Sequence, residues 1–429
     1  MKSYRFPQLD ETVYMDTLPN GLRVCVLPRP GFSRKLAYFV TDFGAIHTSF
    51  IQEGQKIQTP AGIAHFLEHK MFDLPGGRDV SAELAALGAS TNAFTSHDMT
   101  AYYIGCTENF EESLRLLLEF VSTPCFSEES VAKEIGIIDQ EIGMDADNPD
   151  SACFRNLMTA MYREHPIKVE ILGGCDDIRK ITPELLHQCH RAFYTPGNMM
   201  LCVVGDVDAD RVAEIATEML GDQPRPVGEK LRPWQENMTV ATPFCRDAME
   251  VAMPMFNLGF KCEPTGTGEA AIRQEIIGDL AAEALFGESS ALYLKLYEEG
   301  IIDSSFGGGF ETIDGCAMLL CSGDSDHPEA VRDAILARAA EIGEEGVEEE
   351  YFLRLKRSAL GRRIRGLDSF DSTCFRLCAY HFSDFDYFRF PEIYRDIQAE
   401  QIRSFLSRVV RQERCSLSVV NPIQTQEVL

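Results

Sequence analysis

The sequence predicts an α+β protein made of two tandem, structurally similar domains, each a mostly antiparallel sheet packed with helices. Three observations lead to this prediction. The chain has 429 residues, which exceeds the usual length of one domain. Short β-branched segments, typical of strands, alternate with longer segments of helical periodicity. The order of these segments in the first half recurs in the second half, after a proline-rich break.

The first half begins with strands and continues with helices. Segments that are rich in β-branched residues and bounded by Pro or Gly predict strands at 21–30 and 35–46. Thr59 is a favourable N-cap and Pro60 suits the first helical position, so we expect a helix to begin there. The remaining expected elements are a helix at 80–89, a strand–turn–strand unit at 90–107, helices at 109–122, 127–145, 152–163 and 182–193, and a buried strand at 198–207.

The two halves are joined by a stretch without hydrophobic periodicity. Its segment "DQPRPVGEKLRPW" contains three prolines, which is typical of a linker. We therefore expect a first domain at 1–222, a linker at 223–243 and a second domain at 244–429. The expected elements of the second half are a strand at 245–262, a helix at 269–287, a strand pair at 304–324, helices at 328–343, 347–365 and 369–383, and a closing strand at 414–422.

Composition excludes several classes of function. A net charge of −27 with no large cluster of Lys or Arg argues against binding to nucleic acid. No run of 18 apolar residues exists, so no membrane partner is expected, and the N-terminus lacks the apolar core of a secretory signal. The 14 cysteines include no C-x-x-C pair and are expected to be reduced thiols. Together these features predict a cytoplasmic protein.

One short stretch, "GIAHFLEHKMF", carries the first sign of chemistry. His65, Glu68 and His69 fall within an arc of about 100° on a helix, because each residue advances the helix by about 100°. Two imidazoles separated by one helical turn can bind the same zinc ion. The alternative is a polar stripe that faces solvent, but two histidines and a glutamate in the order H-x-x-E-H favour a metal site.

A catalytic zinc needs a third protein ligand, and the helix expected at 127–145 can supply one. Glu134 and Glu141 are seven residues apart and therefore lie on nearly one face, with Ile138 between them. Two carboxylates on a solvated helix are the alternative. The H-x-x-E-H motif shifts the interpretation toward a metal site.

These motifs give the chain a specific resemblance to the pitrilysin/insulinase family of metallopeptidases, which includes the mitochondrial processing peptidases. "GIAHFLEHKMF" is similar to the zinc helix of that family, "GASTNAFTSHDMTAYY" to its substrate strand, and "KEIGIIDQEIGMDADNP" to its third-ligand helix. Two further features resemble a bacterial branch of the family that is associated with modification of elongation factor P. They are Lys70, directly after the motif, and the segment "SSALYLKLYEEGIIDSSF".

The resemblance implies a set of site residues. One Zn²⁺ per chain is expected, with His65, His69 and Glu141 as its ligands and Glu68 as the general base. Glu134 is expected to support the site without binding the metal. The residues expected to bind substrate are Asn92, Ala93, Phe94 and Thr95.

The resemblance also implies an activity and partners. We expect a zinc-dependent endopeptidase that hydrolyses peptides or unfolded protein segments, with a metal-activated water and a second domain that helps to hold substrate. A homodimer, or a heterodimer with a related paralogue, is expected. Many family members carry an Arg and a Tyr in the second half where this chain has Tyr297 and Asp303. The alternative is therefore a weak or inactive subunit that serves a paralogue as a scaffold or regulatory partner.

Overall fold

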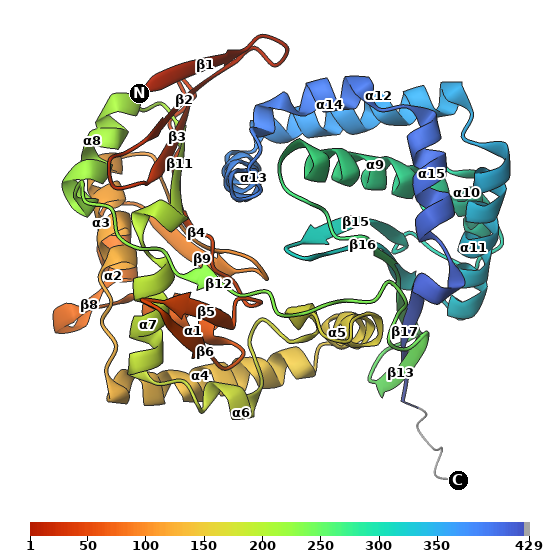
Figure 1. The fold of residues 1–429 in the computed structure, drawn as a ribbon, viewed down its shortest axis with the longest axis horizontal. Coiled ribbons are helices and arrows are strands. Elements are labelled where there is room, and N and C mark those ends of the chain that lie inside the picture. The colour runs from red at the N-terminus through yellow and green to blue at the C-terminus, as the bar shows by residue number, and fades with distance from the viewer. Residues whose placement is uncertain (424–429) are drawn as a thin grey trace. The chain divides into compact units, whose positions relative to one another are not determined.

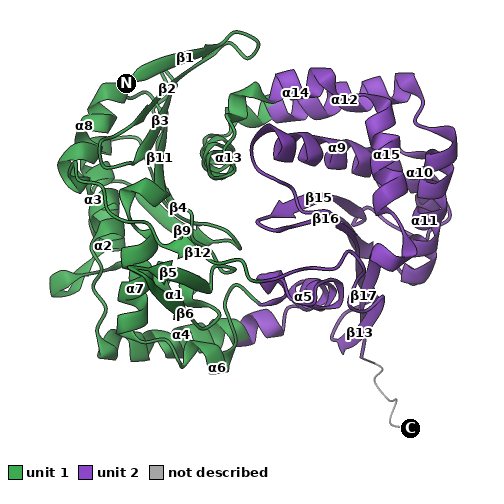
Figure 2. Ribbon diagram, in the orientation of Figure 1, with its two compact units in different colours: residues 1–142, 170–233, 364–389 green, residues 143–169, 234–363, 390–429 purple. Residues whose placement is uncertain are grey.

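The computed structural model describes residues 1–423 and consists of two compact units (Figures 1 and 2). Unit 1 comprises residues 1–142, 170–233 and 364–389. Unit 2 comprises residues 143–169, 234–363 and, within the described chain, 390–423. Each unit contains its own sheet and helices, which agrees with the α+β class predicted from the sequence.

The main sheet of unit 1 is mixed and has seven strands in the order β1-β2-β3-β11-β4-β10-β9. All neighbours are antiparallel except β3 and β11, which are parallel. The strands are β1 (Lys2–Phe6), β2 (Glu11–Thr17), β3 (Arg23–Pro28), β11 (Met199–Gly205), β4 (Lys35–Thr41), β10 (Thr100–Cys106) and β9 (Ser90–Thr95). Strand β9 is therefore an edge strand of this sheet.

Two smaller sheets and a set of helices complete unit 1. The small sheets are formed by β12 (Glu229–Lys230), β5 (Ser49–Gln52) and β6 (Gln55–Gln58), and by β7 (Asp73–Leu74) and β8 (Arg78–Asp79). The helices are α1 (Ile63–Lys70), α2 (Val80–Ala86), α3 (Phe110–Ser122), α4 (Glu128–Ala146), α6 (Cys175–Ile178), α7 (Pro183–Phe193), α8 (Ala209–Leu220) and α13 (Phe370–Phe382). Helix α4 runs four residues beyond the limit of this unit at Ile142.

The sheet of unit 2 repeats the connectivity of the first. Its order is β13-β17-β14-β16-β15, and only β13 and β17 are parallel. This is the arrangement of β3-β11-β4-β10-β9 in unit 1. The strands are β13 (Phe244–Met249), β17 (Cys415–Pro422), β14 (Met255–Cys262), β16 (Cys316–Asp324) and β15 (Gly307–Ile313). The predicted pair of similar α+β domains is thus confirmed by the shared topology.

Apart from α5, which comes from the first half of the chain, the helices of unit 2 follow the strands in the order seen in unit 1. The helices of unit 2 are α5 (Pro149–Met161), α9 (Gly268–Phe286), α10 (Ala291–Glu298), α11 (Pro328–Glu345), α12 (Glu349–Arg365), α14 (Phe390–Asp396) and α15 (Ala399–Val409). Short 3₁₀ turns occur at Pro75–Gly77, Pro166–Lys168, Pro196–Asn198, Gly366–Asp368, Tyr387–Arg389 and Gln412–Arg414. By element order and strand pairing, α9 and α12 of unit 2 correspond to α1 and α4 of unit 1.

Each sheet is covered on one face by a helix from the other half of the sequence. In unit 1, α13 packs against β11 and β4, and in unit 2, α5 packs against β17 and β14. The predicted halves, 1–222 and 244–429, differ from the compact units by these exchanged segments. Sequence periodicity identifies a helix but not the sheet on which it packs, because that depends on tertiary contacts.

Two expected boundaries are wrong. Helix α1 begins at Ile63 and not at Thr59, whose N–H and hydroxyl both donate to the Thr48 carbonyl. The expected strand at 245–262 is two strands, because the chain must reverse between β13 and β14 to flank β17 on both sides. Strands β1 and β2 at the N-terminus were not expected, and the side chains of β1 are almost all exposed.

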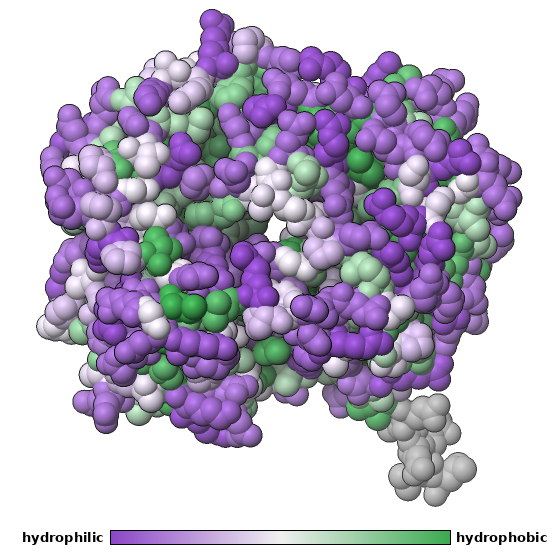
Figure 3. Space-filling model, in the orientation of Figure 1, coloured by the Kyte–Doolittle hydropathy of each residue, from purple (hydrophilic) through white to green (hydrophobic). Residues whose placement is uncertain are grey.

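The surface agrees with the acidic, charge-rich composition. Hydrophilic residues cover most of the face of the molecule shown in Figure 3, and charged residues make up 25% of the chain. The apolar residues gather in the cores instead. In unit 1 every residue of β11 is buried, with α13 on one face of the sheet.

The exchanged helix leads to a prediction about stability. Residues 1–233 expressed alone lack α13 and leave one face of β4 and β11 uncovered. We expect this fragment to bind the dye 8-anilinonaphthalene-1-sulfonate and to lack a cooperative thermal transition, because apolar surface that α13 buries would face water. A fusion that adds residues 364–389 through a flexible linker should bind less dye and unfold cooperatively. Cooperative unfolding of the shorter fragment, without excess dye binding, would contradict the prediction.

Candidate metal centre

The start of α1 is fixed by a close approach of two backbone segments in unit 1. Gly62 precedes the helix with φ of 81°, a left-handed conformation that favours glycine. A Cβ atom at Gly62 would lie 2.3 Å from the Leu172 carbonyl oxygen, and one at Gly173 would lie 2.6 Å from the Ala61 carbonyl oxygen. The loop that carries Gly173 therefore sets where α1 begins and how it enters the core.

Helix α1 is almost completely buried, which is unusual for a helix with three polar motif residues. Seven of its eight residues are buried, and His69 is the exception. A helix that is enclosed on all sides normally carries apolar residues. The burial of His65, Glu68 and Lys70 therefore requires partners for each, since an unpaired polar group in the core is costly.

The sequence-predicted metal ligands lie together. One ligand atom from each of His65, His69 and Glu141 falls within 4.8 Å of the others. His65 Nε2 lies 3.7 Å from Glu141 Oε1, and His69 Nε2 lies 3.8 Å from Glu141 Oε2. The two imidazole rings are 4.5 Å apart between centroids. Helices α1 and α4 thus bring two nitrogens and a carboxylate to one point.

These distances fit a zinc ion better than direct hydrogen bonds. Separations of 3.7 and 3.8 Å are too long for N–H···O bonds. Two ligand atoms joined to one zinc by bonds of about 2.1 Å at a tetrahedral angle would lie about 3.4 Å apart. Nδ1 of His65 is buried and has no hydrogen-bond partner among the described residues. The donor set of two imidazoles and a carboxylate is one that zinc accepts in proteins.

Glu134 lies beside the candidate ligands and contacts His69 from the opposite side of its ring. Its Oε1 is 2.9 Å from His69 Nδ1, and its Oε2 is 3.4 Å from Lys70 Nζ. Lys70 also contacts Asp73. The structure therefore separates the two helix glutamates: Glu141 faces both Nε2 atoms, and Glu134 faces Nδ1 of one imidazole.

Glu68 is held by a residue of the edge strand. The Thr95 hydroxyl donates to Glu68 Oε2 over 2.7 Å, and Thr95 is the last residue of β9. The Thr95 and Thr100 hydroxyl oxygens are 3.4 Å apart, and the Thr100 hydroxyl donates to the Phe43 carbonyl over 2.8 Å. One oxygen of the Glu68 carboxylate is thus engaged, and the other accepts no hydrogen bond from the described residues.

Burial sets the protonation of the motif. It lowers the pKa of His65 to about 3, with the neighbouring His69 acting in the same direction, so this imidazole is neutral at pH 7. Burial also raises the pKa of Glu68, and the Thr95 hydroxyl and His69 oppose that rise. For His69, burial acts against the charged form, but the hydrogen bond to Glu134 and the nearby carboxylates leave its pKa raised. Burial alone would raise the pKa of Glu134, but His69 and Lys70 lower it.

Strand β9 presents alternate amides at the edge of the sheet. The Ser96 N–H donates to the Met99 carbonyl at the turn, so the next hydrogen-bonded pairs along the antiparallel ladder are Phe94–Ala101 and Asn92–Tyr103. The Ala93 and Thr95 amides therefore point away from β10. The Ala93 N–H accordingly donates a hydrogen bond of 2.9 Å to the side-chain oxygen of Asn92 and not to a neighbouring strand.

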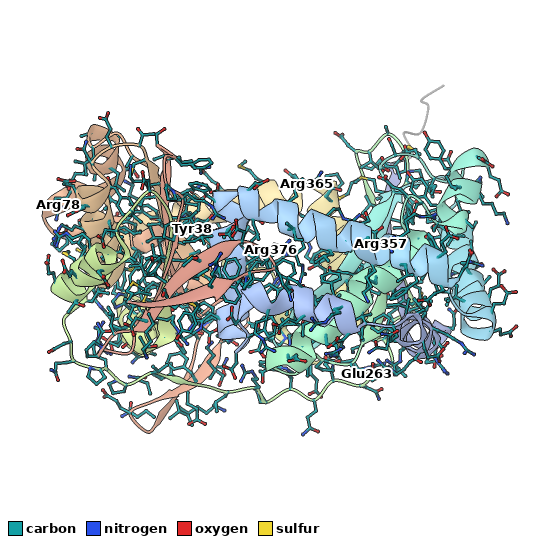
Figure 4. All side chains as sticks on the ribbon, turned by 90° about the horizontal axis from the view of Figure 1, so that it is seen from above. Tyr38, Arg78, Glu263, Arg357, Arg365 and Arg376 are labelled. Carbon is teal, nitrogen blue, oxygen red and sulfur yellow. The ribbon has the colours of Figure 1, made fainter. Side chains whose placement is uncertain are left out.

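The side chains of β9 alternate between the two faces of the sheet. Thr95 faces α1, as its contact with Glu68 shows. Phe94 faces α13, since its ring lies 5.9 Å from that of Phe375. On this second face Tyr38, which Figure 4 labels, stacks on Tyr103 with ring centroids 4.7 Å apart. The four residues predicted to bind substrate therefore lie on an edge strand, but their side chains alternate between the face toward α1 and the face toward α13.

Two contacts at the site were not predicted from the sequence. Lys70 was noted only as part of a family resemblance, and its contact with Glu134 depends on the packing of α1 against α4. Thr95 was expected to contact substrate and not the general base. Thr95 pairs with Thr100 at the end of β9, and its nearness to Glu68 can be recognised only once the fold is known.

The two residues that depart from the family pattern lie in unit 2. Tyr297 is on α10 and half exposed, and its ring stacks on Tyr293. Asp303 accepts hydrogen bonds from the backbone and hydroxyl of Ser305, which lowers its pKa. Asp303 thus stabilises a local turn.

Comparisons with known proteins agree with this fold. The sequence model of the insulinase family, peptidase family M16, matches residues 50–174, and a model described as the peptidase M16 inactive domain matches residues 180–359. An "uncharacterized zinc protease", YmfH of Bacillus subtilis, is 35% identical over 98% of this chain and 99% of its own length. Mitochondrial-processing peptidase subunit beta of Caenorhabditis elegans is 29% identical over 49% of this chain and 45% of its own.

Solved structures give the same result. An M16-like peptidase from Alicyclobacillus acidocaldarius matches with a TM-score of 0.92 at 33% identity. The match covers 96% of this chain and 98% of that one. A protease from Helicobacter pylori has a TM-score of 0.81 at 19% identity, covering 96% of this chain and 100% of its own, and shares the fold.

The fold and the converging His–His–Glu group are those of a zinc-protease-like protein with two related domains. The chain belongs to peptidase family M16, the insulinase family. Its candidate metal ligands all lie in the segment matched by the first family model. None of the helices in the described part of the chain combines the length and apolar character that crossing a bilayer requires.

Proposed function

We propose that this protein is a zinc-dependent endopeptidase that cleaves peptides or unfolded protein segments. The observation that carries the proposal is the convergence of His65, His69 and Glu141, with Glu68 on the same helix. One zinc ion per chain is proposed. The names of the relatives support zinc and proteolysis in this family. The dimeric state, a paralogous partner and a cytoplasmic location stay predictions from the sequence.

The residues of α1 and α4 divide the chemistry between them. His65, His69 and Glu141 would hold the zinc, which when bound supplies a Lewis acid for amide hydrolysis. Glu68 would take a proton from the attacking water and return it to the leaving amine. Because Thr95 occupies Glu68 Oε2, the proton is accepted at Oε1. Burial of Glu68 supports this role, since it brings the pKa of the carboxyl upward toward the working pH.

The edge of β9 would bind substrate as an added strand. The Ala93 and Thr95 amides face away from the sheet, and an extended peptide can accept hydrogen bonds from them. In the free protein the Asn92 side chain occupies the Ala93 amide and would have to leave it. Recognition through backbone groups requires an unfolded segment and tolerates varied sequences.

The second candidate is a subunit with little turnover that supports a paralogue. The observation in its favour is that Asp303 is engaged in a local turn and Tyr297 stacks on Tyr293, while the family resemblance implies an Arg and a Tyr in this region. Peptide turnover by the isolated zinc-loaded chain separates the two candidates. Turnover that appears only when a related paralogue is added would favour the second.

The metal assignment predicts a graded loss of zinc. His65→Ala and His69→Ala should lose it, because two protein ligands do not hold a catalytic zinc tightly. Glu141→Ala should bind it weakly, and Glu134→Ala should bind it better than Glu141→Ala. Elemental analysis of each purified variant measures this, with His187→Ala on α7 as a matched control. If Glu134→Ala lost zinc and Glu141→Ala kept it, the two roles would be reversed.

The general-base assignment predicts that Glu68→Gln keeps zinc and fold but loses turnover. General acid–base assistance is worth about 10²- to 10⁴-fold, so kcat should fall within that range. Cleavage of an unfolded peptide is followed together with zinc content, and the exposed Glu184→Gln on α7 serves as the control. Unchanged cleavage by zinc-loaded Glu68→Gln would remove this residue from the mechanism.

The strand-addition mode predicts a different effect at neighbouring positions of β9. Ala93→Pro removes an outward N–H and should lower kcat/KM about fivefold or more, since one backbone hydrogen bond is worth about 1 kcal/mol. Phe94→Pro removes a ladder hydrogen bond and should instead lower the melting temperature. Ala93→Ser keeps the amide and is the control. A folded Ala93→Pro variant with normal kcat/KM would show that substrate does not add to this edge.

A further inference from the structure

Lys70 is a buried charged residue at the end of α1 to which no role has been assigned so far. Its relative exposure is 2%, although lysine is among the residues least often buried. It directly follows His69 in the sequence and closes the helix that carries the H-x-x-E-H motif. Removing an ammonium group from water is costly, so its partners must compensate for the lost hydration.

Those partners are two carboxylates, and one of them belongs to the metal centre. Lys70 Nζ contacts Asp73, whose side chain is half exposed, and lies 3.4 Å from Glu134 Oε2. The other oxygen of Glu134, Oε1, is 2.9 Å from His69 Nδ1. Glu134 therefore bridges an ammonium group and an imidazole, with one oxygen for each.

This bridge determines which nitrogen of His69 can bind a metal. A carboxylate that accepts a hydrogen bond at Nδ1 keeps the proton there and leaves the lone pair on Nε2. Nε2 is the nitrogen that faces Glu141. The ammonium group on Oε2 restricts the rotation of the Glu134 carboxylate, so Oε1 stays directed at His69.

We propose that Lys70 is a positioning residue for the metal centre, which acts on zinc through Glu134 and His69. Asp73 holds Nζ from the solvent side and completes the chain Asp73–Lys70–Glu134–His69. The inference rests on the proposed zinc binding but not on peptidase turnover. This role differs from a simpler one, in which Lys70 only stabilises the C-terminal end of α1 as a basic residue near the helix dipole.

The test is the zinc affinity of the full-length chain, measured by competition with a chromogenic chelator. Lys70→Met should bind zinc about 10-fold more weakly, since removal of groups that orient a ligand typically costs 10- to 100-fold. Lys70→Arg retains the charge and should recover most of the affinity. Lys180→Met is the matched control, because Lys180 forms an exposed pair with Asp177 at the same three-residue separation. It should bind zinc as the wild type does.

A double-mutant cycle identifies the route by which Lys70 acts. In a Glu134→Gln background, Lys70→Met should cause no further loss of zinc affinity, because the group through which it acts is already changed. A role limited to the helix end predicts an undiminished effect in that background. Thermal unfolding of each metal-free variant is recorded in parallel, since a purely structural role lowers the melting temperature without changing zinc affinity.

The outcomes are distinct. Wild-type zinc affinity in a folded Lys70→Met variant overturns the inference, as does an effect of Lys70→Met that is undiminished by Glu134→Gln. If Lys70→Met does not fold, Lys70→Gln is measured in the same way, because its amide can still bond to Asp73 and Glu134. Failure of the wild-type chain to bind zinc would contradict the proposed function and is recognised before any variant is compared.

Discussion

The hydrogen bond between His69 Nδ1 and Glu134 Oε1 joins the two helices on which the candidate site depends. Helix α1 is short and enclosed, and α4 is long, with Ile138 between Glu134 and Glu141 fully buried in the core of unit 1. Once Glu134 lies against His69, the helical repeat carries Glu141 two turns further along the same face. That displacement places Glu141 opposite the Nε2 atoms of both histidines. A single contact of 2.9 Å therefore sets the register in which the three nitrogen and oxygen donors converge.

The polar groups around this contact stabilise one another. His65 is neutral because it is buried, Glu68 receives the Thr95 hydroxyl, and Lys70 lies between two carboxylates. The surrounding core of unit 1 keeps these groups in place, and the loop at Gly173 fixes the start of α1. Thr95 has two functions in this arrangement, since its hydroxyl holds the general base and its amide faces the edge where substrate would add. Thr95 would therefore take part both in binding substrate and in orienting the general base.

Sequence periodicity was enough to predict the fold class, the repeated order of elements and the placement of Glu134 and Glu141 on one face of a helix. It could not distinguish a covering helix of one sheet from that of the other, so the exchange of α5 and α13 was missed. It also placed the start of α1 at Thr59, because Thr and Pro are good initial residues and the contact between Gly62 and Leu172 is tertiary. Lys70 and Thr95 were undervalued for the same reason. Their partners, Glu134 and Glu68, are separated from them by 64 and 27 positions in the sequence.

The shared topology of the two units shows what distinguishes a metal centre from a structural ion pair on the same framework. In unit 2, α9 and α12 occupy the places of α1 and α4, and they also carry charged groups that face one another. Arg363 of α12 lies 2.6 Å from Glu275 and 3.9 Å from Asp279, both on α9. The guanidinium group is a permanent cation that belongs to the chain, so these carboxylates already have a positive partner. In unit 1 the corresponding helices supply imidazoles and carboxylates, with Lys70 engaged by Glu134 and Asp73, and among the described residues no Lys or Arg pairs with Glu141. The carboxylates of α9 thus face an arginine, whereas Glu141 of α4 faces two histidines, and of these two sets only the one in unit 1 is suited to a metal ion.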